Sequence, residues 1–147
     1  MKKFKFKLDT VLRVRRHKEE KARQKLADLR RRKMRLETQK SEINGDLKAF
    51  HNNRDEQVDR QTPVQHRQQY SYIHEQHKQI KQLDNKIENL AKQVAEQRKK
   101  LIEANKQTKI LSNLKSKHKM NFLEEVDRLE QKQLNEIATQ RYNWKRR

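Results

Sequence analysis

The stretch that decides the fold is ARQKLADLRRRKMRLETQKSEINGDLKAF, residues 22–50. Apolar side chains, or lysines with long aliphatic stems, recur in it at alternating steps of four and three residues. The series is Ala22, Leu26, Leu29, Lys33, Leu36, Lys40, Ile43, Leu47 and Phe50. This heptad spacing predicts a helix that buries one narrow seam. Because two seam positions are lysines, whose ammonium groups must reach water, we expect the seam to be weak and half exposed.

A second series with the same spacing follows the single proline, Pro63. Its apolar members are Ile73, Ile80, Leu83, Ile87, Leu90, Val94, Leu101, Ala104 and Leu111, with Gln97 and Thr108 as polar interruptions. Thr62, Pro63 and Gln65 fit the capping residue, first and third positions of a helix start. Two matched seams predict an all-α fold, an antiparallel coiled-coil hairpin of two long helices with an overhanging C-terminal helix.

The predicted hairpin is one elongated unit over residues 1–147. We expect helix one at about 9–57, a turn at about 58–62 and helix two at about 63–142, with residues 115–147 overhanging. A reversal near residue 58 brings Phe50 near Ile73 and Leu8 near Leu111. The overhang keeps an apolar pattern with nothing in the hairpin to pack on, which is typical of a helix that binds a partner.

The rival position for the turn is Asn44-Gly45, a dipeptide that often marks a reversal. Ile43, Leu47 and Phe50 keep their heptad phase through it, and a glycine inside a helix costs only about 1 kcal/mol. We therefore expect helix one to continue through Gly45.

Composition excludes a globular core. The 147 residues are 31% hydrophobic and 40% charged, with a net charge of +19, which leaves a disordered polycation or long helices. One Gly, one Pro and an excess of helix formers favour the helices. A single Gly cannot build a phosphate-binding loop, so we expect neither an enzyme nor a cofactor. The absence of Cys excludes disulfides and thiolate metal sites.

Two further features carry no expected site. His74 and His77 share a helical face, but they are three residues apart where the zinc-protease pattern needs four, so we expect no metal there. The positive N-terminus lacks the apolar run of a signal peptide, and no transmembrane stretch is visible, so we expect a soluble chain.

The positive charge predicts an acidic partner. The densest basic runs are Arg30-Arg31-Arg32-Lys33 and Lys145-Arg146-Arg147, and such surfaces attract nucleic acid, anionic membranes or acidic proteins. A basic helical nucleic-acid-binding protein is the alternative function, although no motif for reading sequence is present. A membrane-surface coiled coil has little support, because the apolar faces are narrow and broken by Lys and Gln.

Three segments, taken in order, resemble the FliJ family of bacterial flagellar export proteins. The first is an F-x-F-x-L segment running into V-L-x-x-R, formed by Phe4, Phe6, Leu8, Val11, Leu12 and Arg15. The second is an aromatic pair with a seam residue at the start of helix two, formed by Tyr70, Tyr72 and Ile73. The third, LEQKQLNEIATQRY at residues 129–142, is similar to E-x-K-x-L-D-E-x-A-x-x-R-Y, with Asn135 replacing the usual Asp.

The resemblance implies a two-helix antiparallel coiled coil, akin to the central stalk subunit of rotary ATP synthases, with no enzymatic activity. Its implied partners are the hexameric export ATPase, the transmembrane export gate protein and export chaperones, whose cycling it assists. Nucleic acid is not among them. The implied location is the cytoplasm, peripherally at the inner face of the cell membrane at the flagellar base.

The resemblance also assigns the two ends of the hairpin. The end with both termini enters the ATPase ring through Phe4, Phe6, Leu8, Leu134, Ile137, Arg141 and Tyr142. We add the basic residues Arg13, Arg15 and Arg16, which can meet acidic loops of the ring. The gate-facing candidates are Ile43, Leu47, Phe50, Tyr70, Tyr72 and Gln76.

Both sets have a purely structural alternative. Ile43, Leu47 and Phe50 lie on the seam and can simply hold the helices together, whereas Tyr70 and Tyr72 flank it and are better placed for a partner. The alternating phenylalanines at the N-terminus can likewise act as a clip onto helix two, near Leu111 and Leu114, instead of contacting the ring.

Overall fold

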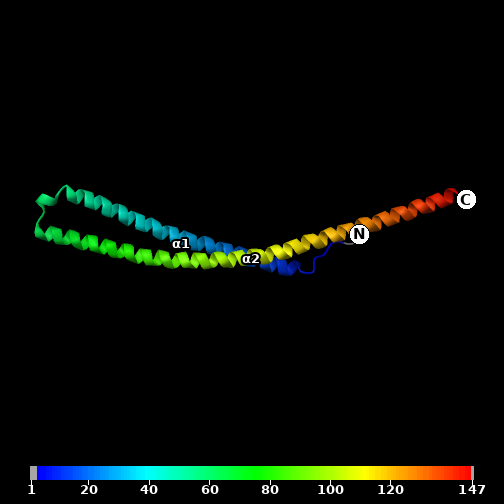
Figure 1. The fold of residues 1–147 in the computed structure, drawn as a ribbon, viewed down its shortest axis with the longest axis horizontal. Coiled ribbons are helices and arrows are strands. Elements are labelled where there is room, and N and C mark those ends of the chain that lie inside the picture. Colours follow the sequence, from blue (N-terminus) through cyan, green and yellow to red (C-terminus); the bar gives the residue numbers. More distant parts are fainter. Residues whose placement is uncertain (1–2, 147) are drawn as a thin grey trace. The chain divides into compact units, whose positions relative to one another are not determined.

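The computed structural model describes residues 3–146 and consists of helices (Figure 1). Helix α1 spans Asp9–Asp55, the 3-10 turn η1 spans Val58–Arg60 and helix α2 spans Pro63–Lys145. No strand occurs within the described range. The two long helices pack against each other, so the all-α prediction is confirmed.

The contacts between the helices divide the chain into two units. One unit combines Met1–Glu20 with Glu103–Arg147, and the other is Lys21–Ile102. We call them the terminal unit and the turn unit. Each contains a part of α1 packed on a part of α2.

The start of α2 is fixed by reciprocal capping bonds. The backbone N–H of Thr62 donates to Gln65 Oε1 at 3.0 Å, and the backbone N–H of Gln65 donates to Thr62 Oγ1 at 3.3 Å. These bonds satisfy amide groups that a helix start leaves unpaired. Helix α1 continues through Asn44 and Gly45, where the backbone φ is not positive.

In the turn unit, the contact between the helices follows the heptad seam. Leu26, Leu29 and Leu47 are buried, while Lys33 and Lys40 are half-buried. The ammonium group of Lys40 reaches the edge of the contact and pairs with Asp84 of α2 at 2.5 Å. The lysine stems therefore cover the seam while their charges find water or a carboxylate.

One buried layer of the turn unit is polar. Gln97 is 5% exposed, and its Nε2 donates to the backbone carbonyl of Ala22 at 3.2 Å. A buried amide without such a partner would carry a desolvation cost of about 1–3 kcal/mol. This bond explains how the helix contact tolerates a glutamine.

In the terminal unit, the apolar contact is short. Leu12 is 1% exposed, the least of the large side chains, and Phe6 and Leu111 are also buried. Thr108 is buried beside them, and its Oγ1 donates to the carbonyl of Ala104 at 3.0 Å. Its hydroxyl is thus satisfied within its own helix.

The pairing of residues differs in part from the predicted one. Near the turn, Phe50 contacts Tyr72, next to the predicted Ile73. At the start of α1, Asp9 contacts Lys115, roughly one helical turn beyond the predicted pairing of Leu8 with Leu111. Between the two helices lie η1 and the extended backbone of Gln61.

Candidate partner-binding surfaces

The two N-terminal phenylalanines lie on α2. Phe6 is buried and meets the ring of His118 edge-on, with 5.8 Å between centroids. Phe4 is half-buried and meets Phe122 at 5.7 Å in a tilted arrangement. Both therefore have partners within the chain, and these partners lie further along α2 than the predicted region around Leu111.

Polar contacts hold the beginning of α1 beside this aromatic cluster. Lys115 Nζ donates to Asp9 Oδ1 at 2.5 Å, and Arg13 lies 3.6 Å from the same carboxyl group. The hydrogen bond and charge of Lys115 lower the pKa of Asp9 below its usual 3.8. The aspartate also lies in the first turn of α1, where a negative charge is favourable.

The predicted basic residues of α1 have different surroundings. Arg15 is half-buried, and its Nη1 donates to the backbone carbonyl of Gln107 at 3.3 Å. Arg13 and Arg16 are exposed, as is Leu8. Arg15 therefore contributes to the packing of the terminal unit, whereas Arg13 and Arg16 remain accessible to a partner.

The end of α2 presents an uncovered apolar face. Leu123, Val126, Leu134, Ile137 and Trp144 recur at helical spacing on one side, and we call them the terminal stripe. All except the half-buried Val126 are exposed, and Trp144 is 87% exposed. From residue 127 to residue 146 every side chain is exposed, so the stripe beyond Val126 is uncovered within the described residues.

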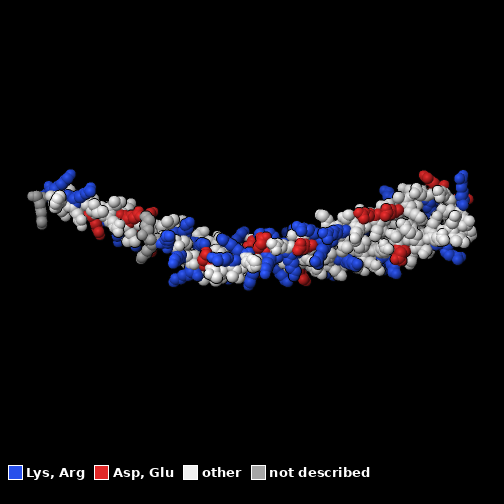
Figure 2. Space-filling model, turned by 180° about the vertical axis from the view of Figure 1, so that it is seen from behind, with Lys and Arg blue, Asp and Glu red and all other residues white. Residues whose placement is uncertain are grey.

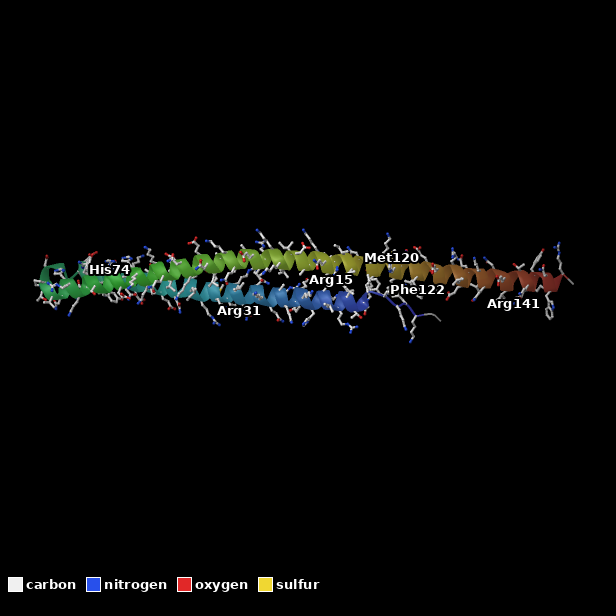
Figure 3. All side chains as sticks on the ribbon, turned by 90° about the horizontal axis from the view of Figure 1, so that it is seen from below. Arg15, Arg31, His74, Met120, Phe122 and Arg141 are labelled. Carbon is white, nitrogen blue, oxygen red and sulfur yellow. The ribbon has the colours of Figure 1, made fainter. Side chains whose placement is uncertain are left out.

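The predicted residues near the end of α2 lie partly on this stripe. Arg141, labelled in Figure 3, shares the face of Leu134 and Ile137, and it is exposed. Tyr142 points about 100° away around the helix, and the guanidinium of Arg146 lies 5.5 Å from its ring centroid. No hydrogen bond, ion pair or ring contact among residues 3–146 joins this group to Phe4, Phe6 or Leu8.

In the turn unit, the six predicted residues separate into buried and accessible ones. Leu47 is buried, and Ile43, Phe50 and Gln76 are half-buried. Tyr72 leans on Phe50, with 4.8 Å between ring centroids. Tyr70 is 71% exposed and stacks on His74 at 6.5 Å with nearly parallel planes. Tyr70 is thus the most accessible of the six.

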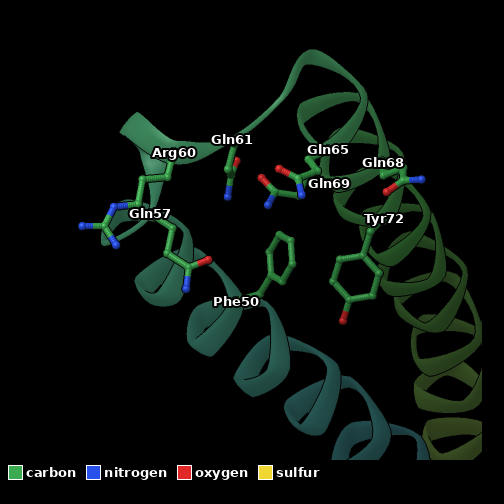
Figure 4. A pocket seen from close by; sticks show the side chains of 8 residues that line it. All are labelled: Phe50, Gln57, Arg60, Gln61, Gln65, Gln68, Gln69 and Tyr72. Atoms are coloured by element: carbon green, nitrogen blue, oxygen red, sulfur yellow. The ribbon is translucent and has the colours of Figure 1, made fainter.

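A hollow of about 500 Å³ lies beside the turn (Figure 4). Its floor is formed by Phe50 and Tyr72, and the amide groups of Gln61 and Gln69 project over Phe50. The Oε1 atoms of these two glutamines are buried without a hydrogen-bond partner. The sequence did not single out either glutamine, because both occur in a long glutamine-rich stretch that gives no contrast.

Two further kinds of site, metal-binding clusters and membrane-spanning helices, were sought among the described residues. Residues 3–146 contain no group of three or more His, Cys, Asp or Glu side chains placed to hold a metal ion, and this range includes His74 and His77. None of the helices in the described range is long and apolar enough to cross a membrane.

A family model described as flagellar FliJ protein matches residues 4–147. The chain belongs to the FliJ family. This membership gives it a role related to flagellar protein export, in a family of non-catalytic export components. Searches of curated proteins and of solved structures found no match.

The family model spans both candidate surfaces of this FliJ chain. Sequence reasoning missed His118 and Lys115 as the anchors of the N-terminal segment. The signal was present, since Leu111, Lys115, His118 and Phe122 continue the four-three spacing of the α2 seam. The heptad pattern was not extended beyond Leu111 because Lys115 and His118 are polar, and of the three following positions only Phe122 is apolar.

Proposed function

We propose that this FliJ-family chain is a non-enzymatic stalk and coupling component of the flagellar type III export apparatus. In this proposal it binds the export ATPase ring with its terminal unit and the transmembrane export gate with its turn unit. It also assists the cycling of export chaperones. It acts in the cytoplasm, peripherally associated with the inner face of the cell membrane at the flagellar base.

The observation that carries the proposal is the uncovered terminal stripe on α2. Four of its five members are exposed in a chain that is only 31% hydrophobic, and they share one side of the helix. An apolar face of this kind on a helix is typical of binding in a groove of a partner. The ATPase ring is the partner implied by the resemblance.

The arrangement that suits this function is an antiparallel coiled-coil hairpin acting as a single unit. Contacts of Asp9 with Lys115 and of Phe50 with Tyr72 support it, because the start of α1 meets α2 far from its start, while the end of α1 meets the start of α2. The lysines and the glutamine in the seam weaken the helix contact and leave charged groups at its edges for partners.

The ATPase part of the proposal is tested with the cognate export ATPase. We expect the wild-type chain to promote hexamer formation and to change the rate of ATP hydrolysis. Leu134→Ser combined with Ile137→Ser should remove both effects while helicity is retained, since both side chains are exposed. Asn135→Ser with Thr139→Ser, on the opposite face of the same segment, is the matched control.

Two outcomes would contradict the ATPase proposal. The first is that the wild-type chain neither binds the ATPase nor changes its rate of ATP hydrolysis, which would refute the proposal as a whole. The second is that the Leu134→Ser, Ile137→Ser variant promotes hexamer formation and changes ATP hydrolysis as much as the Asn135→Ser, Thr139→Ser control does. This would show that the terminal stripe is not the contact surface.

The N-terminal phenylalanines need a separate test, because Phe6 is buried and the clip explanation is supported by its contact with His118. Phe4→Ala with Phe6→Ala should lower the melting temperature if the clip is their main role. Unchanged stability with lost ATPase binding would instead assign them to the ring contact.

The gate part is tested with the cytoplasmic portion of the export gate protein. Tyr70→Ala removes an exposed ring and should weaken binding without affecting stability, whereas Leu47→Ala should affect stability first. Equal gate affinity of wild type and Tyr70→Ala would argue against Tyr70 as a contact.

A further inference from the structure

The solvent side of α1 in the turn unit carries a dense arginine patch. Between residues 21 and 40 there are nine Lys or Arg and two acidic residues, Asp28 and Glu37. Figure 2 shows that Lys and Arg side chains are more abundant than Asp and Glu on the surface of the described chain that faces the viewer. We define the arginine patch as Arg30, Arg31, Arg32 and Arg35, the four arginines nearest to Met34 in the sequence. None of these residues belongs to the ATPase or gate surfaces proposed above.

The centre of the patch is directed away from the seam. Arg31, Met34, Arg35 and Thr38 share one side of the helix by their spacing, opposite the side of the seam residue Leu29. Figure 3 shows Arg31 on the side of α1 that faces away from α2. This side is therefore open to an incoming molecule along its length.

An apolar hollow lies inside the patch. It measures about 390 Å³ and is lined by Arg31, Met34, Arg35, Thr38 and Gln39. Met34 is 68% exposed, more than any other large apolar side chain of α1. Thr38 Oγ1 donates to the carbonyl of Met34 at 2.9 Å, so its hydroxyl is already engaged. Methionine adapts its shape to varied apolar partners.

The charge of the patch is largely uncompensated. Arg31 has one exposed ion pair, with Asp28 at 3.8 Å, which contributes little to stability. Arg30, Arg32 and Arg35 make no ion pair with any residue of the described range. Arg31 and Arg35 are four residues apart on the helix, a spacing at which like charges repel. A partner that supplied carboxylates would relieve this repulsion.

The chemistry of the patch discriminates among anionic partners. Residues 7–49 contain no Phe, Tyr or Trp, so single-stranded nucleic acid finds no aromatic stacking surface here. One exposed methionine is too little apolar surface for an interfacial membrane helix. A protein partner fits better, because carboxylates that flank an apolar side chain on the partner can pair with the guanidinium groups that flank Met34.

We infer that the arginine patch binds an acidic amphipathic helix of a partner protein. An apolar side chain of that helix rests on Met34, and carboxylates on either side of it accept hydrogen bonds from Arg31 and Arg35. The apolar contact sets the position of the helix, and the charge pairs set its orientation and speed its encounter.

The test uses the full chain and a fluorescent helical peptide with a leucine stripe flanked by glutamates. Binding is measured by anisotropy at physiological salt. We expect Arg31→Glu with Arg35→Glu to weaken binding at least about tenfold, since two charge-assisted contacts are reversed. Met34→Ser should weaken it about threefold or more through loss of the apolar contact.

The matched control is Lys99→Glu with Lys100→Glu, which changes the net charge by the same amount at exposed positions of α2 in the same unit. It should alter affinity less than about threefold, because distant surface charges are screened. Circular dichroism should show equal helicity for all variants, since every substituted side chain is exposed.

Three results would overturn the inference. The first is an equal loss of peptide binding in the Lys99→Glu, Lys100→Glu control, which would indicate general attraction by net charge. The second is unchanged binding in Met34→Ser. The third is tighter binding of double-stranded RNA or phosphatidylserine vesicles than of the peptide, with the same dependence on Arg31 and Arg35.

Discussion

Gly45 provides a direct test of the continuity of α1. It lies inside the helix, its φ is not positive, and a Cβ built on it meets nothing within 4 Å. Alanine is favoured over glycine in a helix interior by about 0.8–1.0 kcal/mol. With no steric cost to subtract, Gly45→Ala should raise the free energy of unfolding by that amount. Urea titration followed by far-UV circular dichroism measures the change.

The reciprocal variant uses the same face one turn later. Ala49 is exposed, so Ala49→Gly should lower the free energy of unfolding by about the same 0.8–1.0 kcal/mol. If Gly45→Ala left stability unchanged or lowered it, the reasoning would fail. Such a result would mean that α1 is interrupted at Asn44-Gly45 in solution, as the rejected turn position requires.

Three other changes test the packing of the two units. Leu12→Ala should lower the free energy of unfolding by about 2–3 kcal/mol, measured by urea titration, whereas Val11→Ala, at a more exposed site, should cost under about 0.5 kcal/mol. Gln97→Leu should raise it by about 1 kcal/mol, because the added apolar burial exceeds the lost bond to Ala22, whose carbonyl stays in the helix ladder. The lowered pKa of Asp9 means that its ion pair stabilises the fold fully above pH 3.8 and loses this effect as the pH falls through the folded-state pKa. In acid titrations monitored by circular dichroism, Asp9→Asn should remove that component, and an unchanged acid transition would contradict the contact.

The positions that pack could be predicted from the sequence because helical periodicity is a local property. The four-three spacing marked Leu26, Leu29 and Leu47, all buried, and it also marked Lys33 and Lys40, which are half-buried despite their charge. Hydrophobicity alone would have rejected the two lysines. Periodicity kept them because the spacing identifies a face of the helix and not a residue type.

The pairing between the helices was harder to predict at the start of α1, where Asp9 contacts Lys115 through charged side chains. The heptad pattern selects mainly apolar positions and gives no weight to such a pair. The roles of the individual candidate residues could not be predicted from residue type. Arg13 and Arg15 have the same side chain, and only the three-dimensional fold shows that Arg15 donates to the backbone carbonyl of Gln107 while Arg13 is exposed.

The uncovered end of α2 has a consequence for how it exchanges hydrogen with solvent. Every described residue after Val126 is exposed, so this segment is held helical only by propagation from the packed part of α2. Propagation needs no new nucleus, but each step is nearly balanced, with a factor of about 1–1.6 per residue. Amide exchange should therefore quicken gradually from Asp127 toward Arg146, with no sharp boundary. A partner that binds near Leu134 therefore meets a helix that is already formed. A partner that binds near Trp144 must also order the frayed end of the helix, which costs part of its binding free energy.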